Sequence, residues 1–338
     1  MRATRWCAAA VLAMLALVVL PGDALAAPAP PVVTVEIATV PPVPAARFAI
    51  NGTPMTTDGR GVARLRLPGS SELHRLELLT PTVDGPDGRA EFVRWRGSSV
   101  RHSGYDPVLP TLRVTRSVRL QAAFRVSRLV TYRFVDQAHR PVDLARVTGM
   151  TLRSDTGHLE ELAGSGTMRL TAIRPSSGQG PVVATETSYA IQSVLIDGTN
   201  AVTSGEQRFR PNQVQDLAIV VRLHSVTFRV QDRLLGRPLP ATVRLTYPDG
   251  RAVELPTGLQ GEVSVAGLAR GTYEVQPIGA GYSPPRELAL SRSLYLDLAV
   301  LSRPDLALAG GCGALFLVGL FALRWWRARR RGSSGGGG

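Results

Sequence analysis

The feature that most constrains this chain is a period-two alternation of apolar and polar residues, which recurs through residues 28–305. Val33, Val35 and Ile37 form one such apolar series. The segment 118–126 repeats the pattern, with predicted solvent-facing positions at Arg119, Gln121, Ala123 and Arg125. Asn-Gly and Asp-Gly turn signals separate the runs. The pattern predicts an all-β fold of antiparallel sandwiches or barrels rather than a parallel sheet with crossover helices.

Residues 1–27 have the organisation of a secretory signal peptide. A basic start precedes a short apolar stretch, and the small residues at Ala24-Leu25-Ala26 fit a cleavage site. An uncleaved N-terminal anchor is the alternative.

A second apolar segment, Leu306–Leu323, is uncharged and would be about 27 Å long as a helix, which matches the hydrocarbon core of a bilayer. An arginine-rich tail, residues 324–338, follows it. Because basic residues stay on the cytoplasmic side, we expect a single-pass protein of the cell membrane with its N-terminus outside and its C-terminus in the cytoplasm. The predicted membrane-anchor residues are Gly310, Gly311, Cys312, Trp325, Trp326 and Arg327.

Small residues within this segment leave two further readings open. Gly310 and Ala314 lie four residues apart, a spacing that lets two helices approach closely, although small residues are also common in bacterial spans. Gly310-Gly311, the apolar run and the arginine cluster also resemble bacterial C-terminal sorting signals of the GlyGly type, which rhomboid-like proteases cleave. Retention of the helix and processing at this site are both compatible with the sequence.

An internal repeat sets the expected domain boundaries. Val130–Asp136 (VTYRFVD) recurs as Val226–Asp232 (VTFRVQD), and an Arg-Pro pair follows each copy. After the signal peptide, the repeat predicts three tandem antiparallel β-sandwich-like modules. The expected ranges of the modules are 28–127, 128–222 and 223–303. A transmembrane helix at 306–323 and a cytoplasmic tail at 324–338 follow them.

The third module contains Gly236–Gly250 (GRPLPATVRLTYPDG) and, further on, Gly267–Val275 (GLARGTYEV). These segments resemble the prealbumin-like or carboxypeptidase-regulatory-like sandwich, a relative of the Cna-B type repeat. In that family the tyrosine of a Leu-x-x-Gly-x-Tyr corner closes the core. Leu268, Gly271 and Tyr273 match the corner here. The resemblance implies a fold and no activity.

The first module resembles the InlB-type B-repeats of secreted multidomain proteins. The matching segments are Phe48–Gly52 (FAING), Thr56-Thr57-Asp58 and Phe92–Gly97 (FVRWRG). Trp95, in the last of these, is the only tryptophan outside the terminal segments. We expect it to fill the core of a small sandwich rather than to stack on a ligand.

Residue types exclude several chemistries. All 39 basic residues are arginine, which removes Lys-dependent nucleotide loops, Schiff bases and isopeptide crosslinks. Cys7 and Cys312 lie in the terminal apolar segments, so the middle of the chain has no disulfide and no cysteine nucleophile. The five histidines form no zinc-binding pattern, and no serine elbow is present. We therefore predict no catalytic residue, no cofactor and no metal.

The positive charge bears on the choice of partner. The outer segment, residues 28–305, has 32 arginines and 25 acidic residues, and this mild positive charge favours anionic partners. Arginines at outward strand positions, such as Arg133 and Arg229, also serve to solubilise the sheets. The expected partners are the cytoplasmic membrane, through the single C-terminal helix, and an anionic envelope polymer or a membrane protein. Nucleic acid is not expected, because basic and aromatic residues do not interleave.

These observations predict a non-enzymatic, membrane-anchored cell-surface protein that acts as a binding or scaffolding module at a bacterial envelope. Two alternatives stay open: a subunit or sensor of a membrane complex that works through its transmembrane helix, and a surface hydrolase with dispersed catalytic residues. Loops carry function on such scaffolds. The predicted ligand contacts therefore lie in loops of the first module, at Asp84, Asp87, Arg89, Arg101, His102 and Tyr105.

Overall fold

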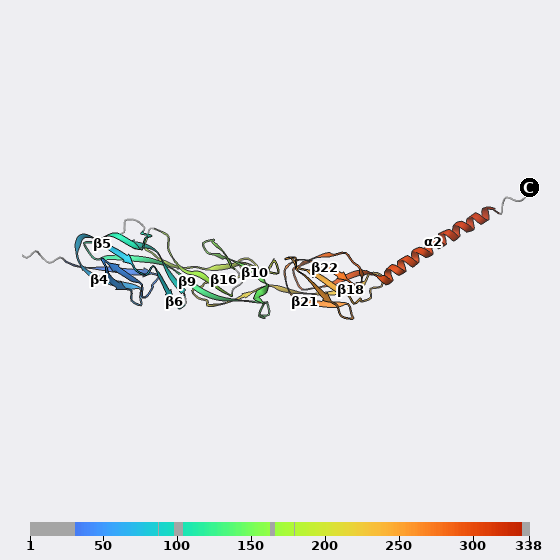
Figure 1. Ribbon diagram of the computed structural model, residues 1–338, viewed down its shortest axis with the longest axis horizontal. Coiled ribbons are helices and arrows are strands. Elements are labelled where there is room, and N and C mark those ends of the chain that lie inside the picture. The colour runs from blue at the N-terminus through green and yellow to red at the C-terminus, as the bar shows by residue number, and fades with distance from the viewer. Residues whose placement is uncertain (1–30, 87, 98–103, 163–165, 179, 333–338) are drawn as a thin grey trace, which may run out of the picture. The chain divides into compact units, whose positions relative to one another are not determined.

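A computed structural model describes residues 31–86, 88–97, 104–162, 166–178 and 180–332 (Figure 1). The described chain consists of β-strands, one 3-10 turn at Leu144–Arg146 and one long C-terminal helix, α2 (Arg303–Gly332). Several separate sheets form sandwiches, which confirms the predicted all-β fold with one C-terminal helix. The predicted signal peptide lies outside the described residues.

The chain divides into two compact units. Of the described residues, unit 1 comprises 31–81, 92–97, 104–123 and 180–182, and unit 2 comprises 82–86, 88–91, 124–162, 166–178 and 183–332. The strands β7 (Gly88–Gly97) and β9 (Val118–Val135) contribute residues to both units. The predicted boundary between residues 127 and 128 falls within β9, which continues through it without a break. The module boundaries drawn from the sequence therefore stay a prediction.

Unit 1 contains two sheets. One has the strand order β3-β2-β5-β8, and in the other β1 pairs antiparallel with β4 and parallel with the beginning of β9. The strands are β1 (Val32–Val40), β2 (Arg47–Ile50), β3 (Thr53–Thr56), β4 (Val62–Pro68), β5 (Ser70–Leu78) and β8 (Val108–Val114). Val33, Val35 and Ile37 are buried, as the alternation predicts.

One residue of β9 departs from the predicted pattern. Ala123, expected on the solvent side, is fully buried, and so is its neighbour Ala122. Successive residues of a strand point to opposite faces of the sheet. Strand β9 is therefore covered on both faces at this point, and the prediction for Ala123 was wrong because an alanine fits either face.

Trp95 fills the core of unit 1. Its side chain is fully buried, and its ring lies 5.7 Å from that of Phe48 and 5.3 Å from that of Phe92, measured between centroids. Tilted aromatic contacts of this kind add to the apolar area that the rings remove from water. The prediction that Trp95 is a core residue rather than a ligand platform is confirmed.

We expect Trp95→Ala to lower the free energy of unfolding by about 4 kcal/mol, because a large buried ring is lost and a cavity remains. Tyr105→Ala, at an exposed position of the same unit, should change it by about 0.5 kcal/mol or less. Chemical denaturation of the full-length chain in detergent measures both. Equal effects of the two substitutions would contradict the assignment of Trp95 to the core.

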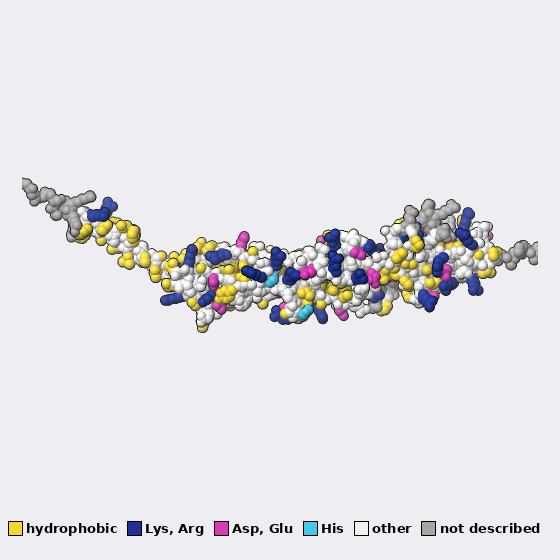
Figure 2. Space-filling view, turned by 180° about the vertical axis from the view of Figure 1, so that it is seen from behind, with side chains coloured by type: hydrophobic (Ala, Val, Ile, Leu, Met, Phe, Trp, Pro, Cys, Tyr) yellow, Lys and Arg dark blue, Asp and Glu magenta, His cyan; other side chains and the backbone are white. Residues whose placement is uncertain are grey.

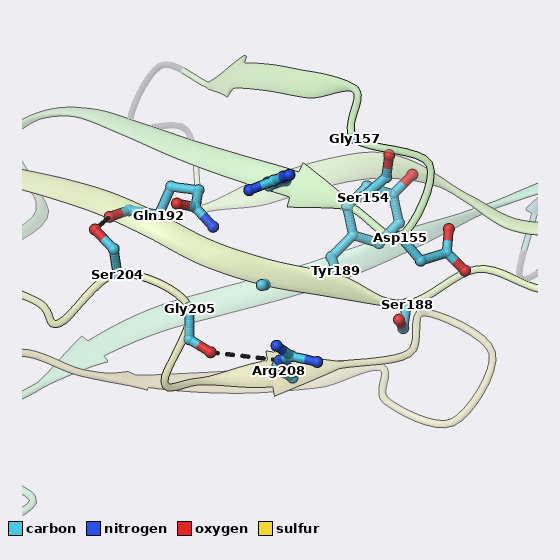
Figure 3. Close-up of a pocket in the computed structure, with 11 residues that line it drawn as sticks. Ser154, Asp155, Gly157, Ser188, Tyr189, Gln192, Ser204, Gly205 and Arg208 are labelled. Atoms are coloured by element: carbon cyan, nitrogen blue, oxygen red, sulfur yellow. Dashed lines mark hydrogen bonds between the residues drawn. The ribbon is translucent and has the colours of Figure 1, made fainter.

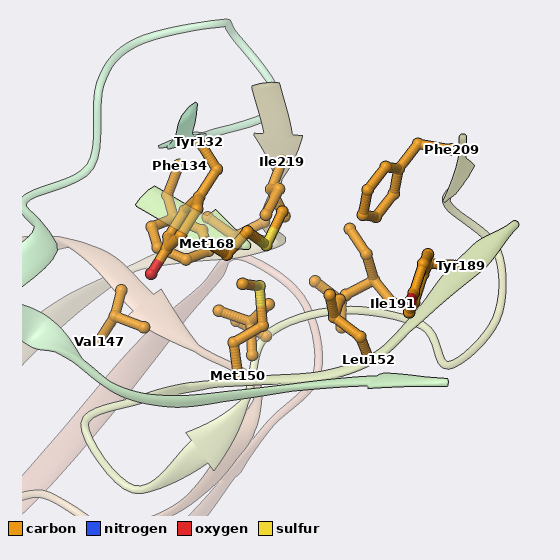
Figure 4. Packing of buried hydrophobic residues seen from close by; sticks show 14 of the residues in the cluster. Tyr132, Phe134, Val147, Met150, Leu152, Met168, Tyr189, Ile191, Phe209 and Ile219 are labelled. Carbon is orange, nitrogen blue, oxygen red and sulfur yellow. The ribbon is translucent and has the colours of Figure 1, made fainter. Parts of the chain in front are cut away.

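Unit 2 contains two sandwiches. We call them the second and the third sandwich, because the two sheets of unit 1 precede them in the chain. In the second sandwich, β9 pairs with β12 and β17, and the facing sheet has the order β11-β10-β14-β15 with β16 beside β14. Its core includes Tyr132, Phe134, Leu152, Tyr189 and Ile191 (Figure 4). Besides β9, its strands are β10 (Val147–Ser154), β11 (Leu159–Leu162), β12 (Thr167–Pro175), β13 (Ala184–Glu186), β14 (Tyr189–Ile196), β15 (Thr199–Asn200), β16 (Arg208–Phe209) and β17 (Asp216–Val220). The short strand β6 (Thr82–Gly85) forms a hairpin with β7.

The third sandwich packs the sheet β21-β18-β25-β23 on the sheet β20-β19-β22-β24. Tyr273 lies in its core, and its hydroxyl donates to the carbonyl oxygen of Ala269 at 2.8 Å. The strands are β18 (Leu223–Asp232), β19 (Thr242–Thr246), β20 (Ala252–Pro256), β21 (Glu262–Ala269), β22 (Gly271–Ile278), β23 (Gly281–Tyr282), β24 (Arg286–Leu290) and β25 (Leu294–Ser302).

The two copies of the repeat take equivalent places in unit 2. Val130–Asp136 lies in β9, which pairs parallel with β17, and Val226–Asp232 lies in β18, which pairs parallel with β25. The proline of each Arg-Pro pair forms a bridge back to its strand. Each sandwich is thus closed by hydrogen bonds between its first and last strands.

A buried carboxylate joins the two sandwiches of unit 2. Asp197 is 4% exposed, and its two oxygens accept from Arg146 at 2.6 Å and from Arg251 at 2.8 Å. Arg146 also donates to the carbonyl oxygen of Gly267 at 2.6 Å. Because Asp197 and Arg146 belong to the second sandwich and Arg251 and Gly267 to the third, these contacts fix the joint between them.

Asp197→Asn should lower the free energy of unfolding of unit 2 by about 3 kcal/mol, since the substitution leaves two arginines facing a site without negative charge. Asparagine keeps the side-chain shape and tolerates the positive φ of 49° at this position. The matched control is Asp84→Asn, in an exposed ion pair, with an expected loss of about 0.5 kcal/mol. Urea denaturation of the full-length chain in detergent separates the two outcomes, and a loss no larger for Asp197→Asn than for the control would show that the joint is not held by this charge.

Helix α2 is long and apolar enough to cross a membrane. Within its segment Arg303–Arg327, the apolar window of 18 residues has a mean hydropathy of 2.3, and none of that window is buried against the rest of the protein. The predicted span 306–323 lies within it. The predicted anchor residues are all exposed along this helix: Gly310, Gly311, Cys312, Trp325, Trp326 and Arg327. Apolar side chains cover the helix up to the arginines that end it (Figure 2).

Candidate functional site

Of the six predicted ligand contacts, the structure describes Asp84, Arg89 and Tyr105. Asp84 and Arg89 lie opposite each other in the β6–β7 hairpin, and the Nε of Arg89 lies 2.8 Å from an oxygen of Asp84. This hydrogen bond lowers the pKa of the Asp84 carboxyl. Tyr105 is 64% exposed but belongs to the other compact unit. Asp87, Arg101 and His102 lie outside the described residues.

A hollow on the second sandwich is the better candidate (Figure 3). It has a volume of about 460 Å³ and lies on the outer face of the β10-β14-β16 strands. Strand pairing places Arg153 opposite Ala190, and Ala190 opposite Arg208. Directly paired residues point to the same face of a sheet, so two arginines flank one alanine.

The spacing of the row follows from sheet geometry. Neighbouring strands lie about 4.8 Å apart, which puts the Cα atoms of Arg153 and Arg208 about 10 Å from each other. Ala190 between them has only a methyl group, and this leaves the space open. The alternate residues Leu152, Tyr189 and Phe209 point the other way, into the core (Figure 4), and hold the three strands in place.

Both arginines are free of acidic partners. Among the residues that the structure describes, no carboxylate lies within 4 Å of the guanidinium group of Arg153 or Arg208. Arg208 makes one long hydrogen bond, from its Nε to the carbonyl oxygen of Gly205 at 3.4 Å. The one acid in the lining, Asp155, lies 3.4 Å from Arg174 in an ion pair. The hollow therefore offers net positive charge to a ligand.

Neutral polar groups complete the lining. Gln192 is the extra residue of a β-bulge in β14, a device that redirects a side chain, and it lines the hollow together with Ser188. Ser204 donates its hydroxyl to the carbonyl oxygen of Gln192 at 2.6 Å and so fastens the bulge to the adjoining loop. Two guanidinium groups with an amide and a hydroxyl suit an oxyanion carried on a hydroxylated molecule.

The carboxylate and the phenol that line the hollow, Asp155 and Tyr189, both have partners. Tyr189 contributes to its wall, but the phenol points into the core and donates to Glu160 at 3.1 Å. Burial, followed by the charge of Glu160, raises the pKa of Tyr189, so the phenol stays neutral. No histidine lines this hollow.

A second hollow of about 350 Å³ lies beside the joint of the two sandwiches and contains His224, Asp136 and Ser225. Asp136 is bound to Arg140, with 2.7 Å between the charged groups, and no hydrogen bond among the described residues joins His224 to Asp136 or Ser225. Burial, followed by the charges of Arg222 and Arg270, lowers the pKa of His224. A serine hydrolase activates its hydroxyl through a hydrogen bond to a base, and the structure shows no such bond between Ser225 and His224. Within the described chain, no group of three or more histidine, cysteine or acidic side chains could hold a metal ion.

Sequence reasoning missed the arginine row. Arg153 and Arg208 look like ordinary outward strand positions, and only the pairing of β10 and β16 to opposite edges of β14 brings them together. Over the face seen in Figure 2, arginines and acidic residues are interspersed rather than gathered in one patch. A count of charges therefore gives no signal for this site.

Comparisons with known proteins give distant structural matches only. No protein-family model matches the chain, and no curated protein matches its sequence. Three solved structures are similar at low identity: the Bacillus anthracis TIE protein (14% identity, 79% of this chain and 51% of that chain, TM-score 0.29), the pilus adhesin SpaC from Lactobacillus rhamnosus GG (10%, 80% and 43%, 0.31) and BcpA, the major pilin subunit of Bacillus cereus (11%, 79% and 98%, 0.23).

The chain thus spans about half the length of the TIE protein structure. It is similar to bacterial pilins and surface adhesins built of β-sandwiches.

We expect Tyr189→Phe to lower the free energy of unfolding by about 1 kcal/mol, the usual worth of one hydrogen bond, and to leave the hollow intact. Glu160→Gln keeps an acceptor for the phenol and should have a smaller effect. Thermal unfolding and anion binding, measured on the same samples, test this expectation. A loss of anion binding in Tyr189→Phe at unchanged stability would show that the phenol takes part in recognition.

Proposed function

We propose that this protein is a non-enzymatic, membrane-anchored cell-surface protein that binds an anionic polymer of a bacterial envelope through the arginine hollow of its second sandwich. The main support for the proposal is the row Arg153–Ala190–Arg208, in which two guanidinium groups without an acidic partner flank an open position. Helix α2 is the anchor, and the arginines at its C-terminal end favour a cytoplasmic C-terminus with the sandwiches outside.

The geometry supports an oxyanion as the bound group. A carboxylate or a phosphodiester placed over Ala190 can accept from both guanidinium groups, and hydroxyls of the same sugar unit lie within reach of Gln192 and Ser188. Each charge-assisted hydrogen bond contributes about 1.5–3 kcal/mol. A single unit is then bound weakly. A polymer that meets many anchored copies is held far more strongly through multivalency.

The double substitution Arg153→Ala/Arg208→Ala should weaken binding of a polyuronate at least about tenfold, since it removes both guanidinium contacts. The control Arg133→Ala/Arg169→Ala removes the same charge from exposed positions elsewhere on this sandwich and should leave the affinity within about twofold. Full-length chain in lipid nanodiscs, titrated with polygalacturonate, gives both values.

A third variant tests the position itself. Ala190→Glu places a carboxylate between the two arginines and should abolish binding while both arginines remain. Neutral dextran serves as the polymer without charge, and a phosphodiester polymer distinguishes phosphate from carboxylate. An equal loss in the control and in the hollow variants would mean that the polymer reads overall charge, and the proposal would fail.

A further inference from the structure

Exposed apolar side chains of the third sandwich gather at one end. Within residues 223–302 the large exposed apolar residues are Leu234, Leu235, Leu259, Tyr282 and Tyr295. Leu259 is 88% exposed and Tyr282 is 67% exposed, and both lie in or beside turns. Tyr295 differs from the others, because it lies within β25 and donates to Glu262. Single exposed leucines are ordinary, but four such residues at one end call for a reason.

Strand register shows that this end is the one from which α2 leaves. Leu234 and Leu235 follow Asp232, which pairs with Val300 near the end of β25. Tyr282 pairs with Leu301, the next residue of that strand. The turn that contains Leu259 reaches the same level, since the carbonyl oxygen of Gly261 accepts from the N–H of Val230. Figure 1 shows α2 continuing from this end of the sandwich.

No linker separates the sandwich from the helix. Strand β25 ends at Ser302 and α2 begins at Arg303. The N–H of Asp305 donates to the hydroxyl of Ser302 at 3.2 Å, and that hydroxyl donates to the carboxylate of Asp232. Asp305 is 2% exposed. The first turn of the helix is therefore fastened to the sandwich, which sets the position of the turns relative to the membrane.

The lengths place these turns in the headgroup layer. The uncharged span begins at Leu306, about 5 Å along the helix from Arg303 at 1.5 Å per residue. The polar layer on each side of the hydrocarbon core is about 5–8 Å thick. Residues at the level of Arg303, including the turns that pair with the end of β25, then lie within that layer when Leu306 is at the edge of the hydrocarbon.

The charge at this end fits a lipid surface. Arg233, Arg237 and Arg303 are exposed, whereas the two acids nearest to them in the sequence, Asp232 and Asp305, are buried. Among the described residues these three arginines form no ion pair. Leucine and tyrosine side chains with arginines beside them are the usual composition of a surface that enters the interface and contacts lipid phosphates.

We propose that the turns bearing Leu234, Leu235, Leu259 and Tyr282, with Arg233, Arg237 and Arg303, form a membrane-contact face that enters the headgroup layer of the bilayer crossed by α2. This inference rests on the proposed function in one respect, that α2 spans the membrane. It adds that the third sandwich lies directly on the lipid surface rather than standing away from it. Anionic lipids strengthen the contact through the three arginines.

The test uses the full-length mature chain, reconstituted in vesicles of phosphatidylcholine. These vesicles contain about 30% phosphatidylglycerol as the anionic lipid. Cys312→Ser removes the only cysteine of the described chain, and Leu259→Cys then carries an environment-sensitive fluorophore. Leu159→Cys, at a 56% exposed site of the second sandwich, is the matched control. Lipids with a quencher near the headgroup should remove about half or more of the Leu259 emission, because the label lies within about 10 Å of that layer.

A label on native Cys312 separates this proposal from the anchoring on which it rests. If lipids with a deep quencher extinguish the Cys312 label while the Leu259 label matches the Leu159 control, the helix spans the bilayer and the membrane-contact face is wrong. If the Cys312 label escapes quenching, the proposed anchor itself fails. Protection of the Leu259 label that rises with protein density, without lipid quenching, would assign the face to a second copy and overturn the proposal. A label at Leu235→Cys repeats the measurement on a separate turn.

Discussion

Closure of each sandwich by its first and last strands is the constraint on which the rest of unit 2 depends. The parallel pairs β9–β17 and β18–β25 return the chain to the strand where the sandwich began, at the end where the next element starts. Strand β17 ends at Val220 and β18 begins at Leu223, and β25 is followed at once by α2. These connections are short, so they contain no flexible linker and cost little loop-closure entropy. The few residues at each junction then determine the orientation of the neighbouring elements.

Each junction uses a buried aspartate, although in different ways. Asp197 holds arginines from both sandwiches, and Asp232 binds the N–H groups of Leu234 and Leu235 together with the hydroxyl of Ser302 below α2. Hydrogen bonds from Ser302 and from the turn lower the pKa of Asp232 to about 2, so its charge persists at any physiological pH. A chain without disulfides in its folded part can fix its geometry this way, because a buried carboxylate with all its donors in place tolerates little displacement.

The sequence predicts strands and their faces well and tertiary sites poorly, for physical reasons that particular residues show. Period two is a local property, so Val35 and Trp95 could be assigned to the core in advance, whereas Ala123 could not, since a methyl group is compatible with either face. The repeat predicted equivalent strands correctly because its Val and aromatic positions fill the same place in two cores. Asp197-Gly198 was recognisable as a turn, but its role at the joint depends on Arg251, which lies in another sandwich. The arginine hollow depends in the same way on the register of three strands, and register is a pairing property that no single segment contains.

The two proposed surfaces are linked by the rigid connections between them. If α2 is anchored and the third sandwich rests on the headgroups, the Asp197 joint holds the second sandwich, and with it the Arg153–Arg208 hollow, at a set position above the membrane. Anchored copies then present their hollows in one plane, where a polymer that engages one copy remains close to the next. Under those conditions the effective concentration of further oxyanions is high, and a weak individual site gives firm attachment. Freedom at either junction would spread the hollows over a larger volume and weaken the attachment, which gives a functional reason for the absence of linkers in unit 2.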